Sequence, residues 1–217
     1  MNINITMIPQ VLREYNQWVL WKLVQNNNGR NTKVPYNKNG FKAKSNDSST
    51  WMTFEDAYAA YIQSPEEYSG LGFMFSESDE FIGFDWDHVR NPTTGEFKAG
   101  ILDEIVSLES YAEISQSGEG AHVIAKGKMP GNRTRKDGRE MYDHDRFFVV
   151  TGNHISETPL TINEAPEEAI LDIYCKIDSS ANKDSEELGP RLRDDEVIGK
   201  CKNAANGKLF EQLYSGN

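Results

Sequence analysis

The chain has 217 residues, of which 37% are hydrophobic and 11% aromatic, so it can bury one ordinary core and leave some polar chain for a linker or tail. Its 34 acidic and 23 basic residues give a net charge of −11, which by itself argues against a nucleic-acid partner. No stretch approaches the roughly 18 consecutive apolar residues of a membrane span, and the N-terminus lacks the pattern of a secretory signal, so we expect a soluble, cytoplasmic protein.

The first part of the chain predicts a hairpin followed by a helix. Residues 18–24 (WVLWKLV) are rich in β-branched and aromatic residues, and the asparagine-rich segment after them is typical of a turn. Residues 33–36 (KVPY) are the expected returning strand, with Pro35 near an edge of the sheet. Thr53 then offers a side-chain acceptor at the N-cap of a helix that we expect to end near Ser64.

Short strands and helices are mixed between residues 71 and 176. Two apolar runs, residues 71–75 and 81–87, are separated by the polar segment SESDE, which indicates an antiparallel pair. The apolar spacing predicts helices over residues 99–108 and 162–176. Further strands are expected at residues 111–115, 121–126, 139–142 and 147–151. This mixture favours an α+β fold over a doubly wound parallel sheet.

The C-terminal part of the sequence predicts a linker and a helical segment. Residues 178–190 lack almost all large apolar side chains, whereas residues 194–214 place apolar residues at roughly helical spacing. The two cysteines, Cys175 and Cys201, lie outside any CxxC pattern, which argues against a disulfide scaffold or a zinc module. We therefore expect a core over residues 1–177, a linker over 178–192 and a helical connector over 193–217 that leads to a further domain.

The segment FIGFDWDHV, residues 81–89, carries the sharpest chemical signal. Residues two apart in a strand share a face, so Asp85 and Asp87 are expected to project together. Two adjacent carboxylates repel each other unless a cation lies between them, and ligation by oxygen alone suits Mg²⁺ or Mn²⁺. The alternative is that the strand ends here and the two aspartates cap the following turn.

The segment SQSGEGAHVIAKG, residues 115–127, predicts a glycine-rich hairpin. A turn containing Gly118 and Gly120 exposes backbone N–H groups, and the side chains of Ser117 and His122 could join them in holding a polyphosphate. The Walker A pattern is absent. The segment is also compatible with an ordinary hairpin in which His122 is a core residue.

The segment REMYDHDRFFVVTG, residues 139–152, predicts two strands joined by a tight turn at residues 143–145. Strand alternation puts Glu140 and Tyr142 on one face of the first strand. A lone glutamate on a strand is usually solvated, but Glu140 is available as the third carboxylate of a metal site.

Together, the three segments fit two-metal phosphoryl transfer. Two ions held by Asp85, Asp87 and Glu140 would activate an attacking 3′ hydroxyl and stabilise charge on the α-phosphate and the leaving pyrophosphate. Separate groups must bind the β- and γ-phosphates. The candidates for this nucleotide-binding role are Ser117, Gly118, Gly120, His122 and Arg146.

Basic residues gather in two parts of the chain despite its negative net charge. Residues 1–50 hold seven basic residues against two acidic ones, and residues 126–139 hold six against Asp137 alone. Such clusters can contact the phosphates of a nucleic acid, although each is also compatible with a solvated loop. The candidate nucleic-acid-binding residues are Lys33, Lys128, Arg133, Arg135 and Lys136.

In the order and spacing of its motifs, the sequence resembles the archaeo-eukaryotic primase superfamily, in particular the primase-polymerases of phages, plasmids and other mobile elements. The family's acidic DxD matches Asp85-Trp86-Asp87, its serine and histidine phosphate motif matches the segment from Ser117 to His122, and its third acid matches Glu140. The match extends over about residues 15–175, and the segments WVLWK, KVPYN, TWMTFEDA and NAANGKLFEQLYSG are also similar to these replication proteins.

This resemblance implies a two-lobed α+β core whose second lobe is similar to an RNA-recognition-motif sheet. It implies a template-dependent DNA primase and polymerase that joins nucleoside triphosphates on single-stranded or primed DNA with two Mg²⁺ or Mn²⁺ ions. It further implies the cytoplasm of a bacterial or archaeal host as the location, and a helicase domain after the core.

Two other functions and two other acids stay open at this point. Carboxylates with a histidine also suit a metal-dependent nuclease, although the phosphate-binding segment would then lack a purpose. The basic loop 126–139 and the aromatic residues suit a non-catalytic module that binds single strands. Asp143 and Asp145 are alternative third acids, and Glu140 is preferred because it precedes the aromatic strand at the family's usual offset.

Overall fold

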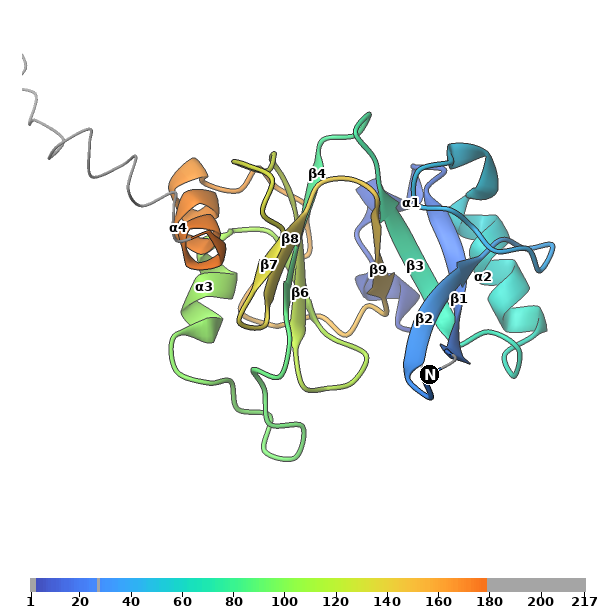
Figure 1. Ribbon diagram of the computed structural model, residues 1–217, viewed down its shortest axis with the longest axis horizontal. Coiled ribbons are helices and arrows are strands. Elements are labelled where there is room, and N and C mark those ends of the chain that lie inside the picture. Colours follow the sequence, from blue (N-terminus) through green and yellow to red (C-terminus); the bar gives the residue numbers. More distant parts are fainter. Residues whose placement is uncertain (1–2, 27, 179–217) are drawn as a thin grey trace, which may run out of the picture. The chain divides into compact units, whose positions relative to one another are not determined.

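The computed structural model describes residues 3–26 and 28–178, and these residues form two antiparallel sheets and several short helices. Figure 1 shows the sheets beside each other, with α2 (Phe54–Gln63) against the first, and with α3 (Ile101–Ser107) and α4 (Glu167–Ile177) on the outer side of the second. In the described part of the chain, no helix is long and apolar enough to cross a membrane. The predicted α+β class is confirmed.

The first sheet has the strand order β2-β1-β3-β9. Its strands are β1 (Trp18–Gln25), β2 (Asn31–Tyr36), β3 (Gly70–Phe75) and β9 (Arg146–Val150). β1 and β2 form the predicted hairpin, in which Leu20 lies opposite Tyr36. β2 is an edge strand, so Pro35, which has no N–H to donate, leaves the inner ladder intact.

Short helices accompany this sheet. α2 begins after Thr53, whose hydroxyl oxygen accepts a hydrogen bond from the Asp56 N–H at 3.1 Å, as its N-cap position predicts. The buried side chains of Ala57 and Tyr61 join the core that β1 and β3 build. The single-turn elements at Gln10–Arg13 (α1), Ile5–Met7 and Ser48–Thr50 were not predicted, because one turn carries no repeated apolar spacing.

The second sheet has the strand order β5-β6-β4-β8-β7. Its strands are β4 (Phe81–Trp86), β5 (Tyr111–Ile114), β6 (Ala121–Lys126), β7 (Arg135–Lys136) and β8 (Arg139–Tyr142). β5 and β6 form the predicted glycine-rich hairpin. β7 was not predicted, although Asp137 and Gly138, with φ angles of 50° and 79°, are the Asp-Gly pair typical of a two-residue hairpin turn.

The predicted pairing of residues 71–75 with residues 81–87 is wrong. β3 lies in the first sheet and β4 in the second, and residues 76–80 cross between them. Asp79 holds this crossing, because its carboxylate accepts hydrogen bonds from the N–H groups of Ser76 and Phe81 and from the amide of Gln17. All six residues of β3 are buried, so its apolar run could not reveal which strand lies beside it.

The strands on either side of residues 143–145 do not pair either. β8 belongs to the second sheet and β9 to the first, so the predicted tight hairpin turn is a second crossing between sheets. Asp143 is buried and accepts a hydrogen bond from the Met129 N–H at 3.0 Å, and Asp145 adopts a φ of 53°. The predicted common face of Glu140 and Tyr142 is confirmed, since the Tyr142 O–H donates to the Glu140 carboxylate.

The C-terminal helix of the described region begins later than predicted. Pro166 is its N-cap, and the preceding Glu164 forms a parallel bridge with Lys126 beside β6, so these residues are extended rather than helical. Asp178 caps the other end of α4. The rest of the predicted linker over residues 178–192, and the predicted connector over 193–217, lie outside the described residues.

β9, the edge strand of the first sheet, packs against the face of the second sheet (Figure 1). The ring of Phe148 lies 4.9 Å from the ring of His122 and 5.0 Å from that of Phe75. A Cβ atom on Gly83 would lie 2.6 Å from atoms of both phenylalanine rings. Glycine on β4 therefore lets the two sheets approach, next to the strands that carry the predicted site.

Candidate active site

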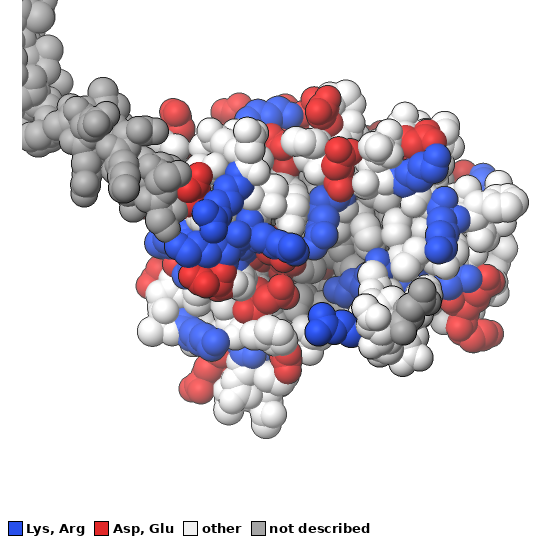
Figure 2. Space-filling view, in the orientation of Figure 1, with Lys and Arg blue, Asp and Glu red and all other residues white. Residues whose placement is uncertain are grey.

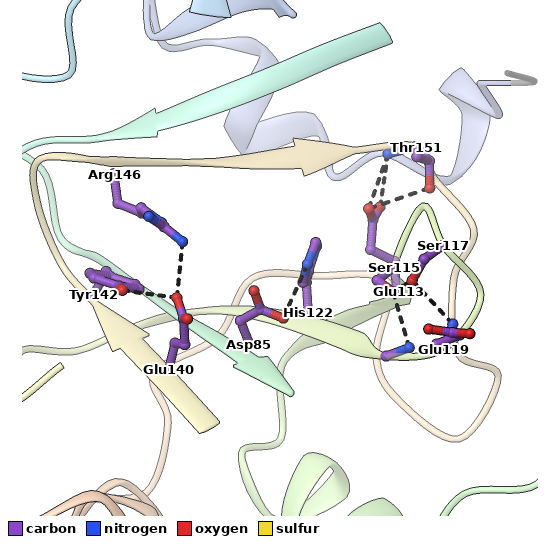
Figure 3. Close-up of polar contacts among 11 residues, drawn as sticks. Asp85, Glu113, Ser115, Ser117, Glu119, His122, Glu140, Tyr142, Arg146 and Thr151 are labelled. Atoms are coloured by element: carbon purple, nitrogen blue, oxygen red, sulfur yellow. Dashed lines mark hydrogen bonds and ion pairs between the residues drawn. The ribbon is translucent and has the colours of Figure 1, made fainter. Parts of the chain in front are cut away.

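A row of ionisable side chains crosses the second sheet at one level. Asp85 of β4 lies opposite His122 of β6 on one side and opposite Glu140 of β8 on the other. The row continues to Glu113 of β5, opposite His122, and to Arg135 of β7, opposite Glu140. Residues that lie directly opposite each other on neighbouring strands point to the same face of a sheet, so these five positions share one face. Figure 3 shows Asp85, Glu113, His122 and Glu140 of this row beneath β9.

A cleft of about 640 Å³ lies between this row and the first sheet. Its walls come from β2, from residues 43–46, from residues 145–149 and from the centre of the second sheet. The ionisable side chains that line it are Lys33, Lys44, Asp85, His122, Asp145 and Arg146. On the face drawn in Figure 2, Lys and Arg side chains gather on both sides of the hollow between the sheets, so local positive charge surrounds the cleft of an acidic protein.

Asp85 and His122 form an ion pair in the floor of the cleft. The Nε2 atom of His122 lies 3.3 Å from Oδ1 of Asp85, and both side chains are largely buried. Burial disfavours the charged form of Asp85, but His122, Lys33 and Arg146 outweigh it and lower the pKa of the carboxyl. Burial likewise opposes a charge on His122, yet the carboxylates of Asp85 and Glu113 raise the pKa of the imidazole. The floor therefore favours a carboxylate beside an imidazolium.

Asp87 follows directly after β4 and extends its alternation. Its N–H donates to the carbonyl of Gly138 at 2.7 Å, which continues the ladder between β4 and the β7–β8 hairpin. Partial burial and repulsion from Asp85 and Glu140 raise the pKa of Asp87. Asp85 and Glu140 are therefore near enough to Asp87 to disfavour its charge, as expected where carboxylates converge without a cation between them.

Glu140 is already engaged by protein donors. Its Oε2 atom accepts a hydrogen bond from the Tyr142 O–H at 2.8 Å and another from a guanidinium nitrogen of Arg146 at 2.9 Å. The guanidinium carbon of Arg146 lies 4.7 Å from the centre of the Tyr142 ring. Arg146 belongs to β9, so this contact joins the two sheets. The other predicted third acids, Asp143 and Asp145, lie in the crossing segment after β8.

The donor set suits Mg²⁺ or Mn²⁺ in its chemistry. It consists of carboxylate oxygens, and Oδ1 of Asp85 is buried with the 3.3 Å ion pair to His122 in place of a well-formed hydrogen bond, so this oxygen keeps acceptor capacity for a cation. Among the described residues, no three acidic, histidine or cysteine side chains already surround one metal position. The residues that would hold the ions are Asp85, Asp87 and Glu140, with the Arg146 contact on Glu140 occupying one of the six carboxylate oxygens.

The glycine-rich turn between β5 and β6 does not offer the free backbone donors that the sequence suggested. The N–H of Gly118 donates to the Ser115 carbonyl, the N–H of Gly120 to the Ser115 hydroxyl, and the N–H of Glu119 to the Ser117 hydroxyl. The hydroxyls of Ser115 and Ser117 lie 3.1 Å apart. The expectation was wrong for Gly118 and Gly120, because both N–H groups are bonded within the turn, and the Ser117 hydroxyl and the His122 ring stay as candidates for a phosphate contact.

The glycine at position 120 has a packing reason. A Cβ atom there would lie 2.2 Å from the carbonyl oxygen of Trp86, at the end of the strand that carries Asp85. Gly118 has a φ of 77°, which a glycine adopts without strain. Both glycines therefore shape the turn rather than exposing it.

The predicted nucleic-acid-binding residues divide into two groups. Lys33 lies in the cleft, where burial and Arg146 lower its pKa although Asp85 and Asp87 act in the opposite direction. Arg135 and Lys136 form β7 at the far edge of the second sheet, Arg133 directly precedes this strand, and Lys128 follows β6. Of these, the ammonium of Lys128 donates to the Asp79 carbonyl at 2.7 Å. Figure 2 shows a broad gathering of Lys and Arg over this edge.

Glu113 was missed by sequence reasoning. It is buried, and its carboxylate accepts hydrogen bonds from the Tyr111 O–H at 2.8 Å and from the N–H groups of Thr151 and Gly152 at 3.1 and 2.9 Å. An acidic residue in the strand YAEI was the available signal, because a lone glutamate between apolar residues must find partners when buried.

Fold and site together define a class of protein. Two antiparallel sheets, a cleft between them, and an aspartate pair facing a third acid across neighbouring strands agree with an archaeo-eukaryotic primase type of core.

Comparison with known proteins identifies a similar phage protein. The DNA primase-polymerase of Nitratiruptor phage NrS-1 is 38% identical to the chain over 160 residues, which cover 68% of the chain. The match spans 21% of the phage protein's own length. No family model matches the chain. The resemblance predicted from the motifs is thereby confirmed, and the chain is a relative of phage primase-polymerases.

Proposed function

We propose that the chain is the core of a template-dependent DNA primase and polymerase that joins nucleoside triphosphates by two-metal phosphoryl transfer. The observation that supports this most directly is the register of β4 and β8, in which Asp85 lies opposite Glu140 while Asp87 continues the same face. The similarity to a phage primase-polymerase points to the same reaction class.

The side chains divide the work by charge. Asp85, Asp87 and Glu140 would hold the divalent ions, whose chemistry when bound would be to activate the 3′ hydroxyl and to stabilise charge on the reacting phosphates. His122, whose pKa the carboxylates of Asp85 and Glu113 raise, and Lys33 both line the cleft and are the candidates for contacts with a triphosphate. The walls of the cleft exclude part of the solvent, which strengthens these attractions.

The substrates of this proposal are nucleoside triphosphates and a single-stranded or primed DNA template. Basic side chains along the edge of the second sheet, Arg135 and Lys136 among them, are candidates for contacts with template phosphates. The setting proposed is replication of a phage or mobile element in the cytoplasm of a bacterial or archaeal cell. A helicase region after the core belongs to the same proposal.

Primer extension with Mn²⁺ or Mg²⁺ tests the reaction. Replacing Asp85 by Asn or Glu140 by Gln keeps the side-chain shape and removes a metal-binding charge, so incorporation should fall by about 10³-fold or more while the protein stays folded. Asp172→Asn is the matched control, because Asp172 is an exposed acid on α4. Unchanged incorporation in Asp85→Asn would refute the assignment.

Two further arms separate this proposal from the other functions. Labelled DNA incubated with metal but without nucleotide should stay intact, whereas a nuclease would degrade it. Calorimetric titration should detect nucleotide binding that depends on the metal. A protein that binds single strands but no nucleotide would instead be a non-catalytic binding module.

A further inference from the structure

β9 is attached to the second sheet at both of its ends, but in different ways (Figure 3). At its C-terminal end, the N–H groups of Thr151 and Gly152 donate to the carboxylate of Glu113. At its N-terminal end, the guanidinium of Arg146 donates to the carboxylate of Glu140. The two attachments flank the cleft and the row of side chains beneath it.

We expect the hydrogen bonds between Glu113 and the C-terminal end of β9 to persist when ligands bind. The carboxylate is buried, with a relative exposure of 2% for the residue, and it also accepts hydrogen bonds from the hydroxyls of Tyr111 and Thr151. Breaking these contacts would leave several buried polar groups without hydrogen-bond partners, and each such group costs about 1–3 kcal/mol of stability.

The ion pair between Arg146 and Glu140 is easier to break. The Arg146 side chain is 43% exposed, so water can replace its contacts, and a partly exposed ion pair is weakened by solvent and salt. Yet its target is the third acid of the proposed metal site. Tyr142 supports the contact twice, by donating to the same Glu140 oxygen and by placing its ring 4.7 Å from the guanidinium carbon.

We infer that Arg146 is the built-in counter-ion of Glu140 in the metal-free protein, and that a divalent cation must displace it to take the Oε2 atom of Glu140. The inference rests on the proposed metal site. A guanidinium and a metal ion compete for this oxygen, so the contact between Arg146 and Glu140 acts as a latch between β9 and the second sheet. With a cation on Glu140, the guanidinium of Arg146 would be free in the cleft, which its side chain already lines.

Calorimetric titration of the full chain with Mn²⁺ alone, without nucleotide or DNA, tests the latch. Arg146→Gln should bind Mn²⁺ about tenfold more tightly than the unaltered protein, because a charge-assisted hydrogen bond no longer competes. Tyr142→Phe removes the second donor without changing any charge, and should tighten binding by about threefold. Circular dichroism checks that both variants are folded.

Lys44→Gln is the control for general electrostatics. Lys44 lines the same cleft, and its ammonium pairs with Asp47 at 3.9 Å, outside the acid row, so its removal weakens the positive field without freeing Glu140. Its Mn²⁺ affinity should change by less than about twofold. An equal gain in Arg146→Gln and Lys44→Gln, or no gain in Arg146→Gln, would overturn the latch.

Asp85→Asn distinguishes failure of the latch from failure of the proposed function. If Mn²⁺ binds the unaltered protein and is lost in Asp85→Asn, the metal site stands whatever the Arg146 variant does. If the unaltered protein and Asp85→Asn take up Mn²⁺ identically, the metal site is wrong and the latch is overturned with it.

Discussion

At the scale of single residues, the candidate site is governed by charges that the chain brings together from separate strands. Asp85 is buried, which alone would favour its neutral form, but His122, Lys33 and Arg146 stabilise its carboxylate. None of these three cations is near Asp85 in sequence. The spacing of the two aspartates can thus be read from the local sequence. The pKa of Asp85 depends on side chains that only the tertiary structure brings near it.

Gly120 gives a test at this scale. In Gly120→Ala the new Cβ atom would lie 2.2 Å from the Trp86 carbonyl oxygen, so the end of β4 must shift. We expect a loss of roughly 2 kcal/mol or more in the free energy of unfolding, measured by urea titration. Because β4 carries Asp85, nucleotide incorporation should fall too. Gly40→Ala is the control, since Gly40 has a φ of 79° with nothing near the position of a new Cβ atom, so the strained φ without any clash should cost only about 1 kcal/mol.

At the scale of elements, one glutamate ties two helices to the second sheet. Glu104 of α3 accepts hydrogen bonds from Arg139 of β8, from Lys176 of α4 and from the indole N–H of Trp86 in β4. Burial opposes the charge of Glu104, but these donors outweigh it and lower the pKa to about 2. The carboxylate of Glu104 therefore links α3 and α4 to strands β4 and β8 of the second sheet.

Glu104 predicts a pH dependence of stability. A folded pKa of about 2 lies below the usual value of 4.5, so the contribution is present above pH 4.5 and is lost as the pH falls toward 2. Glu104→Gln should lower the free energy of unfolding by roughly 1–3 kcal/mol at pH 7. Between pH 5 and pH 3 the variant should lose less additional stability than the unaltered protein. Parallel slopes of stability against pH would contradict this role.

At the scale of the whole described core, two sheets are held together by a few long-range contacts. Gly83 allows the sheets to approach, Asp79 and Asp143 hold the crossing segments, and Glu113 anchors the end of β9. The cleft exists because these contacts set where the first sheet meets the second.

Glu113 tests this coupling. Glu113→Ala leaves the N–H groups of Thr151 and Gly152 without their buried acceptor, and we expect a loss of about 3 kcal/mol or more in thermal or urea unfolding. Glu66→Ala, at an exposed acid in a turn, should change stability by less than about 0.5 kcal/mol. A loss in Glu113→Ala no greater than in the control would show that the sheets are held elsewhere.

The sequence by itself determined the features that depend on neighbouring residues. Alternation along β4 put Asp85 and Asp87 on one face, turn residues marked the first hairpin, and Thr53 marked the start of α2, because side-chain direction and capping are set within a few residues. The family resemblance, rather than any periodicity, selected Glu140 as the third acid.

Only the tertiary structure decided which strands pair and which charges meet. The segments 76–80 and 143–145 resemble hairpin loops, yet both cross between sheets, since strand pairing depends on burial of whole faces that no local pattern records. For the same reason, the contact of Arg146 with Glu140 and the anchoring of β9 by Glu113 appeared only when distant strands were brought side by side.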